Sequence, residues 1–308
     1  MKRASGVLMP VFSLPSKYGI GCFSKEAYKF VDQLKKAGQS YWQILPLGPT
    51  GYGDSPYQSF STYAGNPYFI DLKTLVKEGL LTKKECKEVR CKEQKKIDYE
   101  KIYQNRFKIL KKAYRRFQKN DKYEKFLEEN AFWLEDYCMY MAIKDAHEGK
   151  SWSEWEELLK KREKTALEKV KEELEDEIGF YQFQQYEFDR QWKKLHTYAK
   201  EQGIQIIGDI PIYVAFDSAD AWAAPELFQF DEENNPIRVA GCPPDAFAKT
   251  GQLWGNPLYN WEYHQKTGYA WWIQRIRYCF QRYDVVRIDH FRGFDEYYAI
   301  PYLSLIHI

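Results

Sequence analysis

The chain has 308 residues, of which 44% are apolar, so it can form a buried core and is not a wholly disordered protein. Lysine plus arginine number 46 and aspartate plus glutamate 44, and this net charge of +2 argues against nucleic-acid binding and gives no attraction to an anionic membrane. The length suits one large domain or two smaller ones.

The N-terminal segment carries two basic residues and a short apolar stretch that Pro10 and Pro15 interrupt. It therefore lacks the sustained apolar region of a signal peptide. No run of about 18 apolar residues predicts a membrane span. None of the six cysteines forms a CxxC pair, and no histidine near Cys86 and Cys91 completes a zinc site. We therefore expect free thiols in a cytoplasmic protein.

Composition divides the chain into three segments. Residues 1–79 and 201–308 combine apolar runs with loops rich in glycine and proline, whereas residues 80–200 are rich in lysine and glutamate. We interpret 1–79 as the first part of one domain, 80–200 as a helical insertion subdomain, and 201–308 as the continuation of the first domain.

The first segment predicts a helix followed by two short strands. Ser24 caps a helix with one apolar face, and Gly38 ends it. A strand at 41–47 and a second at 68–72 flank the long loop 48–67. A loop of this length inside a compact domain is usually functional or disordered, and its four aromatic rings argue against disorder.

The middle segment predicts helices. Ser153 and Glu156 have the spacing of a capping box, and the alternating lysines and glutamates of 160–177 indicate a solvated helix face. Gly203 is typical of the position that follows a helix.

The third segment contains the longest apolar strands, at 204–214 and 285–290. Near-continuous apolar strands are typical of parallel sheets that are covered on both faces. Predicted helices at 180–202 and 268–282 precede these strands, and this helix-then-strand order indicates an α/β fold. The pattern leaves open a barrel or a doubly wound sheet, and the absence of GxGxxG argues against dinucleotide binding.

Charged residues collect near the ends of these strands. The first contains Asp209 and the second Arg287, Asp289 and His290. Arg287 and Asp289 are two positions apart, so their side chains share one face of the strand. An adjacent arginine keeps a carboxylate ionised, which suits a nucleophile better than an acid. The alternative is a structural ion pair that only fixes the end of the strand.

The segment 241–261 is predicted to be a loop carrying polar and aromatic side chains, namely Asp245, Gln252, Trp254 and Asn256. A tryptophan ring beside amide and carboxylate groups suits a sugar, because the apolar face of the sugar can stack on the ring and its hydroxyls can form hydrogen bonds with the polar groups. The alternative is a packed surface loop.

Long motifs connect these segments to a known family. They are YWQILPLGPTGYGDSPYQSFSTYAGNPYFIDL (41–72), WLEDY (133–137), IIGDIPIYVAFDSADAW (206–222), VAGCPPDAFAKTGQLWGNPLYNW (239–261) and VVRIDHFRGF (285–294). In order and spacing the set resembles the amylomaltases, bacterial 4-α-glucanotransferases of the α-amylase-like clan.

The resemblance implies an α/β fold, a (β/α)8 TIM-type barrel with a helical insertion, whose site lies at the carboxyl ends of the strands. It implies transfer of α-1,4-glucan segments from maltodextrin donors to other maltodextrins or to glucose, with retention and without metal or cofactor. Asp289 would be the nucleophile. The implied substrate contacts are Ser55, Tyr57, Asp209, Asp245, Gln252, Trp254, Asn256, Arg287 and His290, with Tyr52 and Tyr103 at a second, remote glucan site.

The family's acid/base glutamate, in a Glu-Asp-Leu-Gly context, does not occur in this sequence. We count four strands of the eight expected and therefore expect a C-terminally truncated barrel holding about the first half. Such a chain should be inactive or nearly so by itself, and it should expose apolar surface and associate. A non-catalytic glucan-binding remnant and an α-glucan hydrolase of the same clan are the alternatives.

Overall fold

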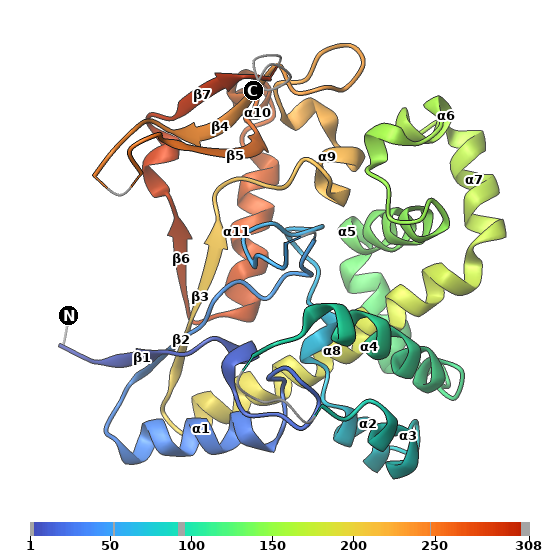
Figure 1. Ribbon diagram of the computed structural model, residues 1–308, viewed down its shortest axis with the longest axis vertical. Coiled ribbons are helices and arrows are strands. Elements are labelled where there is room, and N and C mark those ends of the chain that lie inside the picture. Colours follow the sequence, from blue (N-terminus) through green and yellow to red (C-terminus); the bar gives the residue numbers. More distant parts are fainter. Residues whose placement is uncertain (1–2, 52, 92–95, 247, 303–308) are drawn as a thin grey trace.

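Four strands form a parallel sheet in the computed structural model, which describes residues 3–51, 53–91, 96–246 and 248–302. The sheet order is β1, β2, β3, β6, and every neighbouring pair is parallel (Figure 1). These strands are Gly6–Leu8, Tyr41–Gln43, Gln205–Pro211 and Val285–Asp289. The predicted α/β fold with a parallel sheet is confirmed.

A helix precedes each of the last three strands of this sheet, as parallel pairing requires a crossover connection. Helix α1 (Lys25–Lys36) leads to β2, α8 (Glu175–Glu201) to β3, and α11 (Ala270–Arg282) to β6. The Ser24 hydroxyl caps α1 by accepting the Glu26 N–H at 3.3 Å. The predicted helix-then-strand order is confirmed at all three places.

The predicted strand at 68–72 is wrong. Its first residues lie in a 3-10 turn (Pro67–Phe69), and α2 (Leu72–Lys77) begins directly afterwards. The Asp71 side chain accepts the N–H groups of the first turn of α2, which makes it a helix cap. The strand Gly6–Leu8, which the sequence did not indicate, takes the fourth place in the sheet.

The predicted capping box at Ser153 and Glu156 is also wrong. Ser153 lies inside a 3-10 turn (Trp152–Glu154), and its hydroxyl donates to the Ser151 hydroxyl at 3.0 Å. The following helix, α6 (Glu157–Lys160), begins without a side-chain cap. The sequence has the spacing of a capping box, but the Ser153 hydroxyl makes its hydrogen bond within the turn and not to the start of α6.

Further helices fill the middle of the chain and lie together to one side of the sheet (Figure 1). They are α3 (Lys83–Glu88), α4 (Tyr99–Tyr114), α5 (Asp121–Ala146) and α7 (Lys164–Glu173), besides α6, and α8 runs from this group back toward α1. No helix in the described part of the chain has the length and apolarity that crossing a bilayer requires.

A capping box does occur at the start of α3. The Thr82 hydroxyl accepts the Glu85 N–H, and the Glu85 carboxylate accepts the Thr82 N–H at 2.8 Å. Arg116 donates two hydrogen bonds to the same carboxylate, both at 2.8 Å. These contacts, Arg116 first and the Thr82 backbone second, lower the pKa of Glu85 to about 2.

We expect Arg116→Gln to raise the Glu85 pKa toward its ordinary range. A lowered carboxyl pKa stabilises the fold fully above about pH 4.5 and loses that contribution as the pH falls toward about 2. The variant should therefore lose the part of its acid sensitivity that comes from Glu85. An NMR titration of the Glu85 carboxyl measures this directly, and an unchanged midpoint would contradict it.

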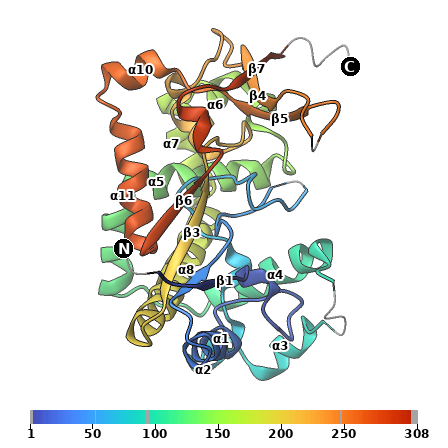
Figure 2. The same ribbon diagram turned by 90° about the vertical axis from the view of Figure 1, so that its left-hand side faces the viewer.

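A second, antiparallel sheet has the order β5, β4, β7. Its strands are β4 (Arg238–Cys242), β5 (Gln252–Pro257) and β7 (Tyr298–Pro301). The segment 241–261 is therefore largely a β-hairpin and not the loop we predicted. In Figures 1 and 2 this sheet lies beyond the carboxyl ends of β3 and β6.

Buried side chains form two clusters, and each draws on all three compositional segments. One contains Val31, Leu195 and Cys279. The other contains Tyr63, Tyr140 and Trp222. The three segments thus share their cores, and the division at residues 79 and 200 stays a prediction.

Candidate active site

Charged side chains from β3 and β6 meet near the carboxyl ends of these strands. The strand register places Asp209 opposite Arg287. The Arg287 guanidinium donates through Nη1 to Asp209 Oδ1 and through Nη2 to Asp289 Oδ1, both at 2.6 Å. The Tyr57 hydroxyl donates to the other oxygen of Asp209 at 2.7 Å. One guanidinium thus joins two carboxylates, with a tyrosine on the far side of the first.

The two carboxylates differ in their access to solvent. The Asp209 side chain is 0% exposed, whereas that of Asp289 is 41% exposed and that of Arg287 is 45% exposed. Arg287 and Tyr57 occupy both oxygens of Asp209. Only Asp289 therefore presents a carboxylate that a solute can reach.

Burial and the neighbouring charges shift two of these groups. Burial disfavours the charged form of Arg287, but the hydrogen bond and charge of Asp209, followed by those of Asp289, outweigh it and raise the Arg287 pKa. Burial, and then the hydrogen bond to Asp209, raises the Tyr57 pKa. Arg287 therefore remains a cation, and Tyr57 remains a neutral hydrogen-bond donor.

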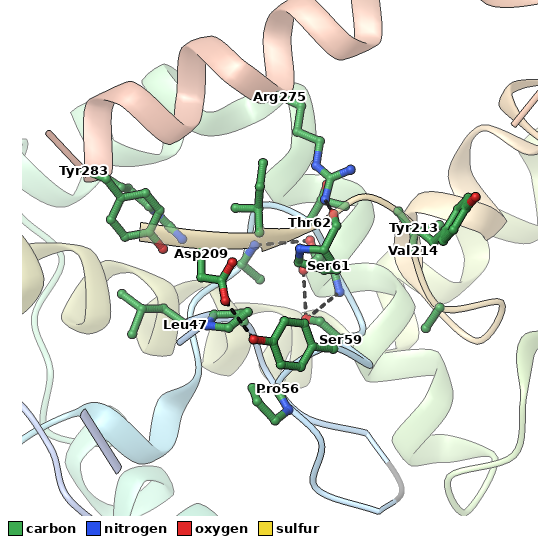
Figure 3. Close-up of a pocket in the computed structure, with 18 residues that line it drawn as sticks. Leu47, Pro56, Ser59, Ser61, Thr62, Asp209, Tyr213, Val214, Arg275 and Tyr283 are labelled. Carbon is green, nitrogen blue, oxygen red and sulfur yellow. Dashed lines mark hydrogen bonds between the residues drawn. The ribbon is translucent and has the colours of Figure 1, made fainter. Parts of the chain in front are cut away.

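A pocket of about 490 Å³ lies next to this cluster, between the loop 48–67, β3 and α11. Figure 3 shows Asp209 pointing into it, with Tyr213 and Val214 at the other end. Tyr57 also lines the pocket, whereas Arg287 and Asp289 do not. Asp209 thus connects the pocket to Arg287 and, through Arg287, to the exposed carboxylate of Asp289.

The hairpin of β4 and β5 brings an aromatic group to the same end of the sheet. The Trp254 ring meets the His290 ring edge to face, with centroids 4.8 Å apart. Its indole N–H donates to the exposed Gln252 at 3.0 Å. His290 directly follows Asp289 and has a left-handed backbone, with φ of 52°. The hairpin therefore contacts the residue next to the exposed carboxylate.

Asn256 lies on the buried side of the same hairpin and is 5% exposed. Its amide donates to the Val214 carbonyl at 2.7 Å, and its oxygen accepts from Gln58 at 3.2 Å. The polar atoms of Asn256 are thus already in use inside the protein.

The remaining predicted residues lie in different places. Asp245 is exposed in the hairpin connection, and its carboxylate accepts the Ala248 N–H at 2.7 Å. Ser55 accepts the Tyr57 N–H at 3.3 Å. Tyr103, on α4, is 58% exposed and packs edge to face on a neighbouring phenylalanine. Tyr52 lies outside the described residues.

Two residues at this site were not singled out from the sequence. Gln58 bonds to the hairpin, and Tyr213 lies 6.2 Å from His290 and 6.3 Å from Trp254, measured between ring centroids. The one available signal for Gln58 is its position next to Tyr57. In the described part of the chain, no group of three or more His, Cys, Asp or Glu side chains could hold a metal ion.

Comparison with known proteins places the whole chain in one family. A family model described as 4-alpha-glucanotransferase matches residues 9–305. The chain is 50% identical to a 4-alpha-glucanotransferase of Clostridium butyricum over 298 residues, which are 96% of this chain and 61% of that protein. The corresponding enzyme of Thermus thermophilus is 47% identical, over 98% of this chain and 61% of that protein. The chain thus spans about three fifths of these relatives.

Solved structures agree with this placement. Amylomaltase from Streptococcus agalactiae in complex with acarbose is 44% identical and superposes with a TM-score of 0.95, over 98% of this chain and 62% of that one. Amylomaltase from Corynebacterium glutamicum, 18% identical, shares the fold with a TM-score of 0.79, over 97% of this chain and 42% of that one. The predicted resemblance is confirmed: the chain belongs to the 4-alpha-glucanotransferase family.

Proposed function

We propose that this chain carries the nucleophile half of a retaining 4-α-glucanotransferase site, with Asp289 as the nucleophile. The observation that carries the proposal is the exposed Asp289 carboxylate, held at 2.6 Å by a guanidinium that is itself anchored on the buried Asp209. A carboxylate that is open to solvent can attack an anomeric carbon and break the glycosidic bond, provided that the leaving oxygen receives a proton. The hydroxyl of an acceptor sugar then displaces the carboxylate, so configuration is retained.

The proposed ligands are α-1,4-glucan donors and glucose or maltodextrin acceptors. Arg287, Asp209 and Tyr57 would surround the sugar at the cleavage point, and Gln252 and Trp254 would contact the acceptor from the hairpin. Ser55, Asp245 and His290 are the remaining proposed contacts, and Tyr52 and Tyr103 the proposed remote site. We propose a cytoplasmic location, for which the six free cysteines are the support.

A retaining mechanism also needs an acid/base carboxyl about 5–5.5 Å from the nucleophile. Asp209 does not suit this role, because Arg287 and Tyr57 occupy both of its oxygens and its side chain is 0% exposed. Without a proton donor the leaving oxygen of a natural glucan departs slowly. We therefore propose that the 308-residue chain alone is inactive, or nearly so, on maltodextrins.

A fluorinated substrate tests the nucleophile without the need for an acid catalyst. Fluoride leaves without protonation, so 5-fluoro-α-D-glucosyl fluoride should react with the 308-residue chain. The Asp289 carboxylate forms a bond to the anomeric carbon, the C–F bond breaks, and fluoride is released. We expect mass spectrometry to find one fluoroglucosyl group on the peptide that contains Asp289.

The control is Asp289→Asn, which keeps the shape and removes the anionic oxygen. Label that persists in this variant, or that maps to another carboxylate, would overturn the assignment. Binding of acarbose without any label would favour the non-catalytic remnant. With α-maltosyl fluoride and added glucose, longer oligosaccharides indicate a transferase, whereas maltose alone indicates the hydrolase.

A further inference from the structure

Two side-chain amides join the loop 48–67 to the hairpin of β4 and β5. Gln58 Nε2 donates to Asn256 Oδ1 at 3.2 Å, and Asn256 Nδ2 lies 3.5 Å from Gln58 Oε1, so the pair is reciprocal. Gln58 Nε2 also lies 3.5 Å from the backbone carbonyl of Trp254. The pair connects residues 198 positions apart in the sequence. We call it the Gln58–Asn256 bridge.

Both ends of the Gln58–Asn256 bridge are firmly held. The Gln58 N–H donates to the Ser55 carbonyl at 3.1 Å, and the Gln58 carbonyl accepts the Gly51 N–H at 3.1 Å. On the other side, Asn256 is 5% exposed and donates to the Val214 carbonyl. A buried amide whose polar atoms are all hydrogen-bonded fixes the relative position of the segments it joins, because any movement between them leaves a polar atom without a partner.

The bridge stands between two sets of proposed sugar contacts. On the loop side, the residue before Gln58 is Tyr57, whose hydroxyl holds Asp209. On the hairpin side, Gln58 holds the backbone of Trp254, whose ring meets His290. A displacement of the hairpin would therefore move Trp254 relative to Tyr57 and to Asp289, which precedes His290.

We propose that Gln58 and Asn256 are positioning residues that couple the sugar contact at Tyr57 to the sugar contact at Trp254, so that the two bind a glucan cooperatively. Neither residue touches the reacting atoms. This inference rests on the proposed function, because it concerns two contacts of the same glucan site. It reassigns Asn256 from a sugar contact to a support of one.

The test is a double-mutant cycle for acarbose affinity, measured by calorimetry on the 308-residue chain. Tyr57→Leu and Trp254→Leu are made singly and together, first with the natural Gln58 and then with Gln58→Met, which keeps length and removes both donors. We expect the two leucine substitutions to be coupled by a factor of about five in the natural background, within the range for interacting residues. In the Gln58→Met background the factor should fall to about one.

If Gln58 had a purely structural role, Gln58→Met would lower all acarbose affinities and leave the coupling factor unchanged, so an unchanged factor overturns the proposal. The proposal is also overturned if Tyr57→Leu and Trp254→Leu are not coupled when Gln58 is present. Gln104→Met makes the same chemical change at an exposed site on α4 and is the matched control. Where Gln58→Met does not melt cooperatively, Gln58→Glu removes the same donors and keeps an acceptor for Asn256.

A second measurement separates this inference from the proposed function. In chain labelled with 5-fluorotryptophan, the ¹⁹F resonance of Trp254 is identified by its loss in Trp254→Leu. We expect it to shift in Gln58→Met and to remain in place in Gln104→Met, with no ligand present. If the natural chain binds no acarbose, the proposed function fails, and the ¹⁹F shift of Trp254 alone then tests the positioning role of the Gln58–Asn256 bridge. A Trp254 resonance that does not move in Gln58→Met overturns that role.

Discussion

Arg287→Met should reduce the free energy of unfolding by about 2–3 kcal/mol and slow the labelling of Asp289 by at least about 100-fold. The substitution leaves the Asp209 carboxylate, which is 0% exposed, without its cationic partner. Breaking a fully buried pair from one side costs about 3–5 kcal/mol. We reduce that figure because Arg287 is 45% exposed and solvent screens its charge. Asp289 would at the same time lose the donor that orients it.

Two further variants identify the cause. Asp209→Asn combined with Arg287→Met removes the unpaired charge and should recover most of the lost stability, but not the labelling rate. Arg287→Lys keeps the positive charge, but an ammonium group cannot bond to both carboxylates as the planar guanidinium does. Asp289 should therefore be labelled well below the natural rate in this variant. Urea denaturation and timed mass spectrometry measure both quantities. Labelling of Arg287→Met at the natural rate would show that Arg287 is only a structural ion-pair partner.

The sequence indicated the contact between Arg287 and Asp289 because it depends only on local geometry. Alternate residues of a strand share a face, and the two side chains do meet at 2.6 Å. The contact between Arg287 and Asp209 depends instead on the register of two strands 78 positions apart. No local pattern specifies that register, and only the resemblance placed the two residues at one sugar.

The errors in the predicted elements have a common physical origin. Residues 68–70 and Leu72 are buried and apolar, as in a strand, but Pro67 and the cap at Asp71 turn the segment into a 3-10 turn and a helix start. The hairpin strands in 241–261 pair with each other and with β7, which lies about forty residues further on. Apolar patterning reports burial, whereas strand formation here depends on distant backbone partners.

Asn256 illustrates the same limit at the site. Its residue type and its neighbours suggested a hydrogen bond to a sugar hydroxyl, and the side chain has the chemistry for one. Its amide is instead turned inward, to Val214 and Gln58. Simple alternation along β5 puts Asn256 on the same face as Gln252 and Trp254, and the register shift between Val239 and Gly241 that interrupts this pairing is not visible in the sequence.

A broad apolar surface lies along α11 and the turn after β6. It forms an open groove of about 1400 Å³, lined mainly by Trp261, Tyr269, Trp272, Ile273, Ile276, Phe280, Ile288, Phe291 and Phe294. Phe280 is 58% exposed and Phe291 66% exposed. Among the described residues, β6 pairs with β3 on one side and with no strand on the other. Monomeric proteins rarely expose a continuous apolar surface beside a free strand edge.

We therefore expect the 308-residue chain to self-associate through this groove. Phe280→Glu combined with Phe291→Glu should shift the chain toward the monomer. A contact formed at the groove would have to bury the two new carboxylates, which costs desolvation free energy and brings like charges together. Leu158→Glu, at an apolar side chain that is 59% exposed on α6, is the matched control and should leave association unchanged. Light scattering after size-exclusion chromatography measures the mass. If the unmutated chain elutes as a monomer and melts cooperatively, the groove does not mediate association. If Leu158→Glu reduces association as much as the double groove variant does, association arises from surface apolarity in general.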